Sequence, residues 1–355
     1  MEDGFPLPIH VPEIDAGDGL CTMVQPLLDG SGNGGAGAVR DYFQRAGRLF
    51  RLVTIDRAAV AVLPWNWETA CSDPARRRFA LQFVRTNAAA GVRTLVFHPH
   101  DSEAPLRIPH TIVLRTSLVR GRHGRHEHAM PWLAEGFAEF GVAGQEPRPF
   151  QPVPTVGFCG TLQRQHYRQP TLFRRLFRRH KNQYPLAYPH APGLRAHAVE
   201  ILRATPGIEF RFVEREQFMG GAVRADGTLD EEILARTRRE FLDNLLESDY
   251  ALCMRGAGNF SIRFSEILAV GRVPLFVDSS CVLPWPDLVD WRDVLTMVDI
   301  RDLASLGTRL LEEHLELGPE GFLRRQRRCR EVWDRYVSPI GFFSTLSERL
   351  AANAL

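Results

Sequence analysis

Short apolar runs alternate with amphipathic segments along most of the chain. Runs such as Val60–Leu63, Thr94–Phe97 and Tyr250–Met254 contain no polar alternation, which is typical of strands buried on both faces of a parallel sheet. Between such runs, apolar residues recur at helical spacing, as they do from Asp73 to Ala90 and from Leu229 to Leu246. This alternation predicts an α/β protein whose helices connect parallel strands.

A proline-rich polar stretch, residues 146–155, separates these elements into two groups. We expect a first domain over residues 1–145, a second over 156–336, and a helical tail over 337–355 that returns toward the first domain. At 355 residues, of which 44% are apolar, the chain is long enough for two cores. Residues 1–38 are rich in Gly, Pro and Asp, and we expect little regular structure there beyond one short strand.

One segment, residues 250–278, predicts a strand, a glycine-rich turn, a helix and a second strand. The helix begins near Ser261, where Asn259 or Ser261 can cap it, and Gly271 marks its end. A glycine turn and a helix N-terminus at the carboxyl end of a parallel strand favour an anion, because N–H groups and the helix dipole are directed there. The segment therefore indicates a phosphate-binding site.

Charged residues accompany this turn. Arg255 and Arg263 can add charge-assisted hydrogen bonds to a diphosphate, and Glu266 can accept hydroxyl groups of a ribose. The alternative from the residues alone is a tight turn followed by a solvated ion pair between Arg263 and Glu266 on the outer face of the helix.

The same segment resembles the donor-binding signature of exostosin-like glycosyltransferases. The matching positions are Arg255, Gly256, Gly258, Ser261, Arg263, Glu266, Leu268, Gly271 and Pro274. Downstream, residues 282–285 and 288–291 resemble the family's VLPF and LDW segments. The resemblance implies the GT-B fold, an α/β architecture in which two Rossmann-like domains with parallel sheets face each other across a cleft. It also implies that the second domain holds a sugar nucleotide, with further donor contacts from Gly160, Thr161 and Arg195.

Two loops at the carboxyl ends of first-domain strands offer a general base. Glu68 follows the strand Val60–Leu63, and His100 with Asp101 follows Thr94–Phe97. The family resemblance reaches His100 and Asp101, so we favour these two and keep Glu68 as the second choice; Asp101 as a turn cap is the alternative. Beside Glu68, Trp65 and Trp67 offer rings on which an acceptor sugar can stack.

These features predict an inverting glycosyltransferase. It would move a sugar from a nucleotide-sugar donor, expected to be UDP-linked, to a hydroxyl of a glycan or small-molecule acceptor, without a cofactor or metal ion. Arg255, Arg263 and the helix N-terminus are expected to stabilise the leaving diphosphate. A nucleotide-sugar-binding protein without turnover and a non-enzymatic scaffold are the alternatives.

Composition narrows the range of partners. A net charge of +2 argues against nucleic acid, and the absence of an 18-residue apolar run or a signal-like start leads us to expect a cytoplasmic, soluble bacterial relative of the family. The basic segment 172–180 is expected to be helical, with either a solvated face or a surface for peripheral contact with anionic lipid or for binding an acidic glycan.

Histidine and cysteine patterns predict no metal site. His123, His126 and His128 lie in a Gly- and Arg-rich stretch that we expect to be a solvated loop. The six cysteines lack CxxC spacing and mostly fall in apolar runs, which favours buried free thiols. The oligomeric state is not predicted.

Overall fold

The computed structural model describes residues 5–14, 19–29, 36–137, 140, 142, 146–162, 191–224 and 226–355. The expected basic helix at 172–180 lies outside these residues. None of the helices in the described ranges combines the length and the apolar character needed to cross a membrane.

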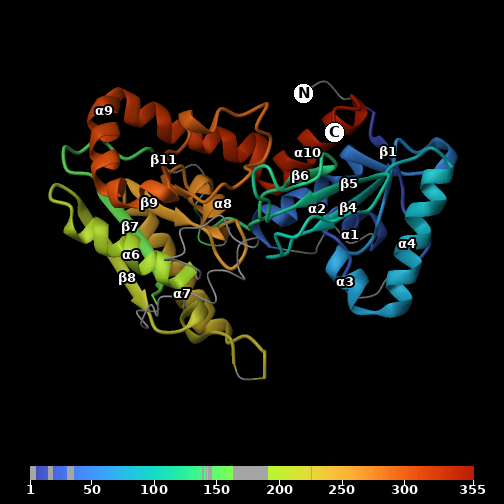
Figure 1. The fold of residues 1–355 in the computed structure, drawn as a ribbon, viewed down its shortest axis with the longest axis horizontal. Helices are drawn as coiled ribbons and strands as arrows, with labels where there is room; N and C mark the ends of the chain where they lie inside the picture. Colours follow the sequence, from blue (N-terminus) through green and yellow to red (C-terminus); the bar gives the residue numbers. More distant parts are fainter. Residues whose placement is uncertain are drawn as a thin grey trace, which may run out of the picture.

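Two fully parallel sheets organise the described residues (Figure 1). The six strands of the first sheet run in the order β2-β1-β3-β4-β5-β6, and they are β1 Leu7–His10, β2 Phe50–Leu52, β3 Val60–Val62, β4 Thr94–His98, β5 Thr111–Arg115 and β6 Glu127–Ala129. The five strands of the second run in the order β11-β10-β9-β7-β8, and they are β7 Thr155–Thr161, β8 Glu209–Arg215, β9 Tyr250–Met254, β10 Val273–Asp278 and β11 Thr296–Asp299. The expected architecture, two parallel-sheet domains of the GT-B type, is confirmed.

Helices connect and cover the strands of both sheets. The α-helices are α1 Gln25–Leu28, α2 Gly37–Leu49, α3 Trp67–Ser72, α4 Pro74–Ala89, α6 Ala191–Ala204, α7 Glu231–Leu246, α8 Ile262–Ala269, α9 Leu306–Val332 and α10 Pro339–Ala351. Side chains cap the N-termini of two predicted helices. Asp73 accepts hydrogen bonds from N–H groups in the first turn of α4, and Asp230 accepts one in the first turn of α7. These caps explain why the predicted and observed helix starts agree so closely.

The C-terminal helix lies on the first domain. Figure 1 shows α10, in red, beside the blue and green elements rather than beside α9. The ring of Phe343 in α10 stacks on that of Tyr42 in α2 with centroids 4.2 Å apart, and both side chains are buried. The tail thus contributes to the core of the first domain.

The order of the second sheet changes direction between β7 and β9. From β7 the chain passes to β8 on one side and later returns to β9 on the other side, so β7 and β9 are neighbours whose connections leave in opposite directions. Ligands of open α/β sheets bind outside the carboxyl ends of the strands at such a switch point. The turn after β9 lies at this point.

All six cysteines are free thiols, and five of them are buried, as the sequence predicts. Burial raises the pKa of Cys21, Cys159, Cys253, Cys281 and Cys329 to about 12. These thiols therefore pack as small apolar groups.

Candidate functional site

Three arginines from three elements meet at the switch point of the second sheet. Arg255 follows β9, Arg263 lies in the first turn of α8, and Arg195 lies in α6. Nη2 of Arg195 donates to the backbone carbonyl of Arg255 at 3.4 Å. Nη2 of Arg263 donates to the carbonyl of Cys159 in β7 at 2.8 Å, and its guanidinium lies 5.0 Å from the centre of the Phe158 ring.

Burial disfavours the charged form of two arginines in this cluster, Arg195 and Arg263. Burial, and then the charge of Arg263, lower the pKa of Arg195 to about 10. Nε of Arg195 is buried and has no hydrogen-bond partner among the described residues. Burial likewise lowers the pKa of Arg263, against the influence of Glu266. A bound polyanion would relieve both effects.

The N-terminus of α8 adds backbone donors to the cluster. Ser261 occupies the N-cap position, yet its side chain makes no capping hydrogen bond. The other expected cap, Asn259, instead donates from Nδ2 to the carbonyl of Leu118 at 2.9 Å and accepts a hydrogen bond from Ser279 at 2.6 Å. The expected side-chain cap is therefore wrong: within the part of the chain that the structure describes, the N-cap side chain makes no hydrogen bond to the first N–H groups of α8.

Glu266 is buried rather than solvated. Only 9% of the residue is exposed, and Oε1 lies 3.6 Å from Nη1 of Arg238 in α7. The alternative of a solvated Arg263–Glu266 pair is wrong, because α7 and β7 cover the helix face that the isolated pattern left open. Of the other expected donor contacts, Gly160 lies under Arg263, where an added Cβ would meet Nη2 at 2.9 Å. Thr161 is partly exposed, and its hydroxyl donates to the carbonyl of Gln217 at 3.3 Å.

The loop after β4 reaches across to the glycine turn. Oδ1 of Asp101 accepts a hydrogen bond from the N–H of Gly258 at 3.0 Å. A Cβ at position 258 would lie 2.8 Å from the Cα of Asp101, so this approach requires glycine. Oε1 of Glu103 accepts from Nη2 of Arg255 at 2.8 Å. The two domains therefore meet directly at the arginine cluster.

A second contact supports this junction. The hydroxyl of Ser117, after β5, accepts from the N–H of Asn259 at 2.8 Å and donates to the carbonyl of Asp101 at 3.3 Å. Sequence reasoning missed Glu103 and Ser117, because residues more than 140 positions apart give no local signal of contact.

A buried ion pair fixes the loop after β4 in place. Arg115, at the end of β5, and Glu127, at the start of β6, both have fully buried side chains and pair with each other. Arg115 also donates to the carbonyls of Ser102 and Ala104, and Glu127 accepts from the N–H of Leu106 at 2.9 Å. The pair thus holds three backbone groups of residues 102–106.

The expected solvated loop over residues 120–128 is therefore partly wrong. Glu127 and His128 belong to β6, and Glu127 is buried. One signal could have indicated Arg115: it directly follows the apolar run Ile112–Leu114, so its side chain has to enter a buried environment. No group of three or more histidine, cysteine, aspartate or glutamate side chains in the described ranges is arranged to hold a metal ion.

Replacing Glu127 with alanine is expected to lower the free energy of unfolding by about 3–5 kcal/mol, because it leaves the buried Arg115 charge without its counterion. Urea denaturation measures this loss. The matched control is Glu247→Ala, which removes a largely exposed ion pair with Arg211 and should cost less than about 1 kcal/mol. A loss of similar, small size in both variants would contradict the assigned role of the buried pair.

The two rival candidates for the general base form one pair. Nε2 of His100 lies 3.0 Å from Oε1 of Glu68 in α3. Nδ1 of His100 accepts a hydrogen bond from the N–H of Ser102 at 2.9 Å, so a neutral imidazole carries its proton on Nε2 and directs it at Glu68. His100 is therefore held by Glu68, whereas Asp101 is directed at Gly258. In this geometry neutral His100 has no free lone pair, and the carboxylate of Glu68 does.

A second histidine supports the ring of His100. His98, the last residue of β4, is 5% exposed and stacks on His100 with centroids 5.2 Å apart. Burial, and then the charge of Arg115, lower the pKa of His98 to about 4. His98 is therefore neutral at physiological pH and adds no repulsive charge beneath His100.

The two expected stacking platforms differ. Trp65 is only 7% exposed and packs edge-on against Phe79, so the expectation of an open sugar platform at Trp65 is wrong. Its ring belongs to the apolar layer beneath α3 and α4, and burial of this ring stabilises the fold. Trp67 is partly exposed and begins α3 together with Glu68, where the sequence had indicated a loop.

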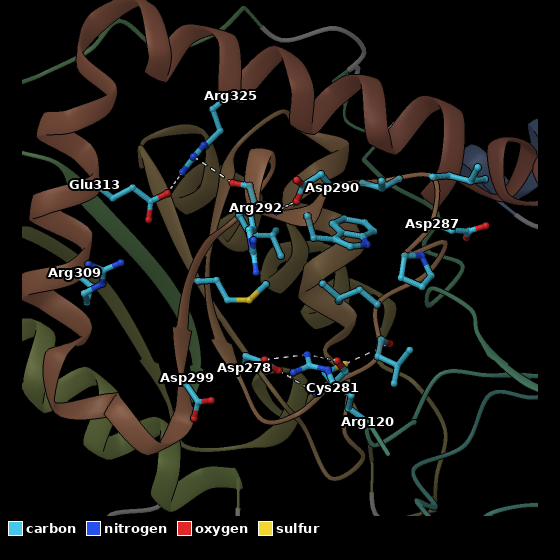
Figure 2. Close-up of a pocket in the computed structure, with 18 of the residues that line it drawn as sticks. Arg120, Asp278, Cys281, Asp287, Asp290, Arg292, Asp299, Arg309, Glu313 and Arg325 are labelled. Atoms are coloured by element: carbon cyan, nitrogen blue, oxygen red, sulfur yellow. Dashed lines mark hydrogen bonds and ion pairs between the residues drawn. The ribbon is translucent and has the colours of Figure 1, made fainter. Parts of the chain in front are cut away.

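A separate groove of about 1490 Å³ lies beside β10, β11 and α9 (Figure 2). Several of its charged side chains form ion pairs: Arg120 with Asp278 at 3.1 Å, Arg309 with Glu312 at 3.1 Å, and Arg325 with Glu313. The three arginines at the switch point do not line it. Arginines that already form ion pairs in this groove are less available to a diphosphate than Arg195 and Arg263 at the switch point.

No protein-family model matches the sequence. A stretch of 92 residues, 26% of this chain, is 30% identical to 17% of a probable glycosyltransferase of Arabidopsis thaliana. Another of 107 residues, 30% of this chain, is 32% identical to 27% of an exostosin-1 homolog of Caenorhabditis elegans. The chain thus aligns with less than a third of the length of either relative.

Among solved structures, a glycosyltransferase from Rickettsia africae covers 98% of this chain and 99% of its own, at 10% identity and a TM-score of 0.37. That overlap is too low to bear on the fold, which rests on the two parallel sheets. The sequence relatives confirm the expected resemblance to exostosin-like glycosyltransferases.

Proposed function

We propose that this exostosin-like chain is an inverting glycosyltransferase that takes a sugar from a nucleoside diphosphate donor, with UDP the first candidate nucleotide. The observation that supports this most strongly is the arginine cluster at the switch point. Arg195, Arg255 and Arg263 converge there, the pKa of Arg195 is lowered to about 10, and Nε of Arg195 has no partner within the described ranges. A diphosphate offers negative charge to all three arginines and an acceptor oxygen to Nε of Arg195.

In this proposal the second domain stabilises the leaving group. Departure of the nucleoside diphosphate from the anomeric carbon develops negative charge on its β-phosphate. The guanidinium groups and the first N–H groups of α8 are already fixed in position, so they stabilise that charge with little reorganisation. Glu266, one turn into α8, is the candidate acceptor for ribose hydroxyls, in exchange for part of its contact with Arg238.

The first domain supplies the base and the acceptor side. In direct displacement the acceptor hydroxyl attacks the anomeric carbon while a base takes its proton. The loop after β4 touches the glycine turn through Asp101 and Glu103, and the same loop carries His100, which pairs with Glu68. We assign proton abstraction to Glu68, oriented by His100, and acceptor stacking to Trp67.

A panel of nucleoside diphosphate sugars tests the proposal. Thermal denaturation should identify one donor that raises the melting temperature, since a ligand at 100 times its Kd stabilises the fold by about 2.7 kcal/mol. Transfer or hydrolysis of that donor then separates an enzyme from a protein that only binds it. Failure of every donor to stabilise the protein would reject the proposed site.

Activity is expected to persist after removal of divalent metal ions. Three arginines lie around the turn after β9, and their guanidinium groups can neutralise the diphosphate. The measurement is the transfer rate before and after dialysis against EDTA. A rate that falls to background and returns with manganese would contradict this expectation.

A further inference from the structure

Carboxylates of the first domain occupy the groups that the proposed function assigns to the donor diphosphate. Oε1 of Glu103 lies 2.8 Å from Nη2 of Arg255, and the two side chains are 21% and 12% exposed. Oδ1 of Asp101 accepts the N–H of Gly258 at 3.0 Å. Each contact places a carboxylate oxygen where a phosphate oxygen would make the same charge-assisted hydrogen bond.

We propose that Glu103 competes with the donor diphosphate for Arg255 and thereby sets the affinity of the site. This inference rests on the proposed function. A diphosphate that binds Arg255 brings at least two negative charges to within a few ångströms of the Glu103 carboxylate, and like charges at that distance repel. Glu103 therefore leaves Arg255 when the donor enters and returns when the nucleoside diphosphate departs.

The backbone around Glu103 makes this competition persistent. Arg115 and Glu127 hold Ser102, Ala104 and Leu106, which flank Glu103 on both sides. The Glu103 side chain can rotate away, but its Cα stays in front of Arg255. The carboxylate consequently acts as a tethered competitor at high local concentration, and every donor has to displace it.

The test is calorimetric titration of inorganic pyrophosphate and of UDP into three proteins: wild type, Glu103→Gln and Arg120→Gln. Glutamine keeps the shape of Glu103 but removes its charge, so Kd for both ligands should fall about tenfold. Arg120→Gln is the matched control, because it also removes a contact between the domains, the 3.1 Å pair with Asp278, while leaving Arg255 untouched. Its Kd values should equal those of wild type.

Three results would overturn the inference. An unchanged or higher Kd in Glu103→Gln would mean that Glu103 does not compete or that it helps to bind the ligand. Equal tightening in Glu103→Gln and Arg120→Gln would attribute the effect to loosened domains. If pyrophosphate binds to none of the three proteins, the arginine site itself is wrong, and the proposed function fails with it. Binding to wild type with no gain in Glu103→Gln leaves the function standing and rejects only the competition.

Discussion

Replacement of Arg263 with alanine is expected to lower kcat/KM for sugar transfer about 30- to 900-fold, equivalent to about 2–4 kcal/mol of transition-state stabilisation. The reason is its position in the first turn of α8 and near Arg195, where we propose that the charge of the leaving diphosphate develops. The steady-state kinetics of the purified variant measure the loss. Near-wild-type turnover in a folded Arg263→Ala protein would contradict the donor-site assignment.

Arg263 also has structural contacts, so a matched control is needed. Arg203 lies in the same domain and places its guanidinium 4.8 Å from the centre of the Phe212 ring, much as Arg263 does over Phe158. Arg203→Ala removes a stacked arginine that is exposed and lies away from the cluster. It should keep wild-type kcat/KM, whereas both variants should show circular dichroism spectra like that of wild type.

Replacement of Glu68 with glutamine is expected to lower kcat by about 10²–10⁴-fold while leaving donor affinity unchanged, because it removes the proton acceptor without altering the arginine cluster. His100→Gln should cause a smaller loss, since Glu68 would remain but lose the group that orients it at 3.0 Å. Single-turnover rates, with Kd for the donor determined separately, distinguish chemistry from binding.

Asp101→Asn provides the comparison within the same junction. Asparagine can still accept the hydrogen bond from Gly258, so this variant should retain most of the turnover. If instead Asp101→Asn abolishes turnover while Glu68→Gln retains it, the base is Asp101, as the sequence pattern with His100 had favoured.

Local patterns were sufficient for the elements that form the two sheets. The apolar runs before Pro64, before His98 and before Arg255 became β3, β4 and β9, because a strand buried on both faces leaves no polar alternation. The glycine turn and the helix after it could also be predicted, because a few consecutive residues determine them. Arg255 therefore follows β9 and Arg263 lies in α8, as the sequence predicted.

Contacts between segments that are distant in the sequence could not be predicted from local patterns. Arg115 follows an apolar run and Glu127 lies in a Gly- and Arg-rich stretch, but only the packing of β5 against β6 shows that their buried side chains pair. The sequence indicated an exposed ring at Trp65, but residues of α4 cover it in the structure. Pairing of His100 with Glu68 instead of Asp101 likewise depends on how α3 approaches the end of β4.

The most direct test of the proposed donor site is the structure of the protein with a nucleoside diphosphate bound, determined from crystals grown with saturating UDP. We expect phosphate oxygens within roughly 3 Å of the guanidinium nitrogens of Arg255 and Arg195 and of the first N–H groups of α8. We also expect Glu103 to be turned away from Arg255. Phosphate bound instead in the groove beside α9, with Glu103 still on Arg255, would contradict the proposed donor site.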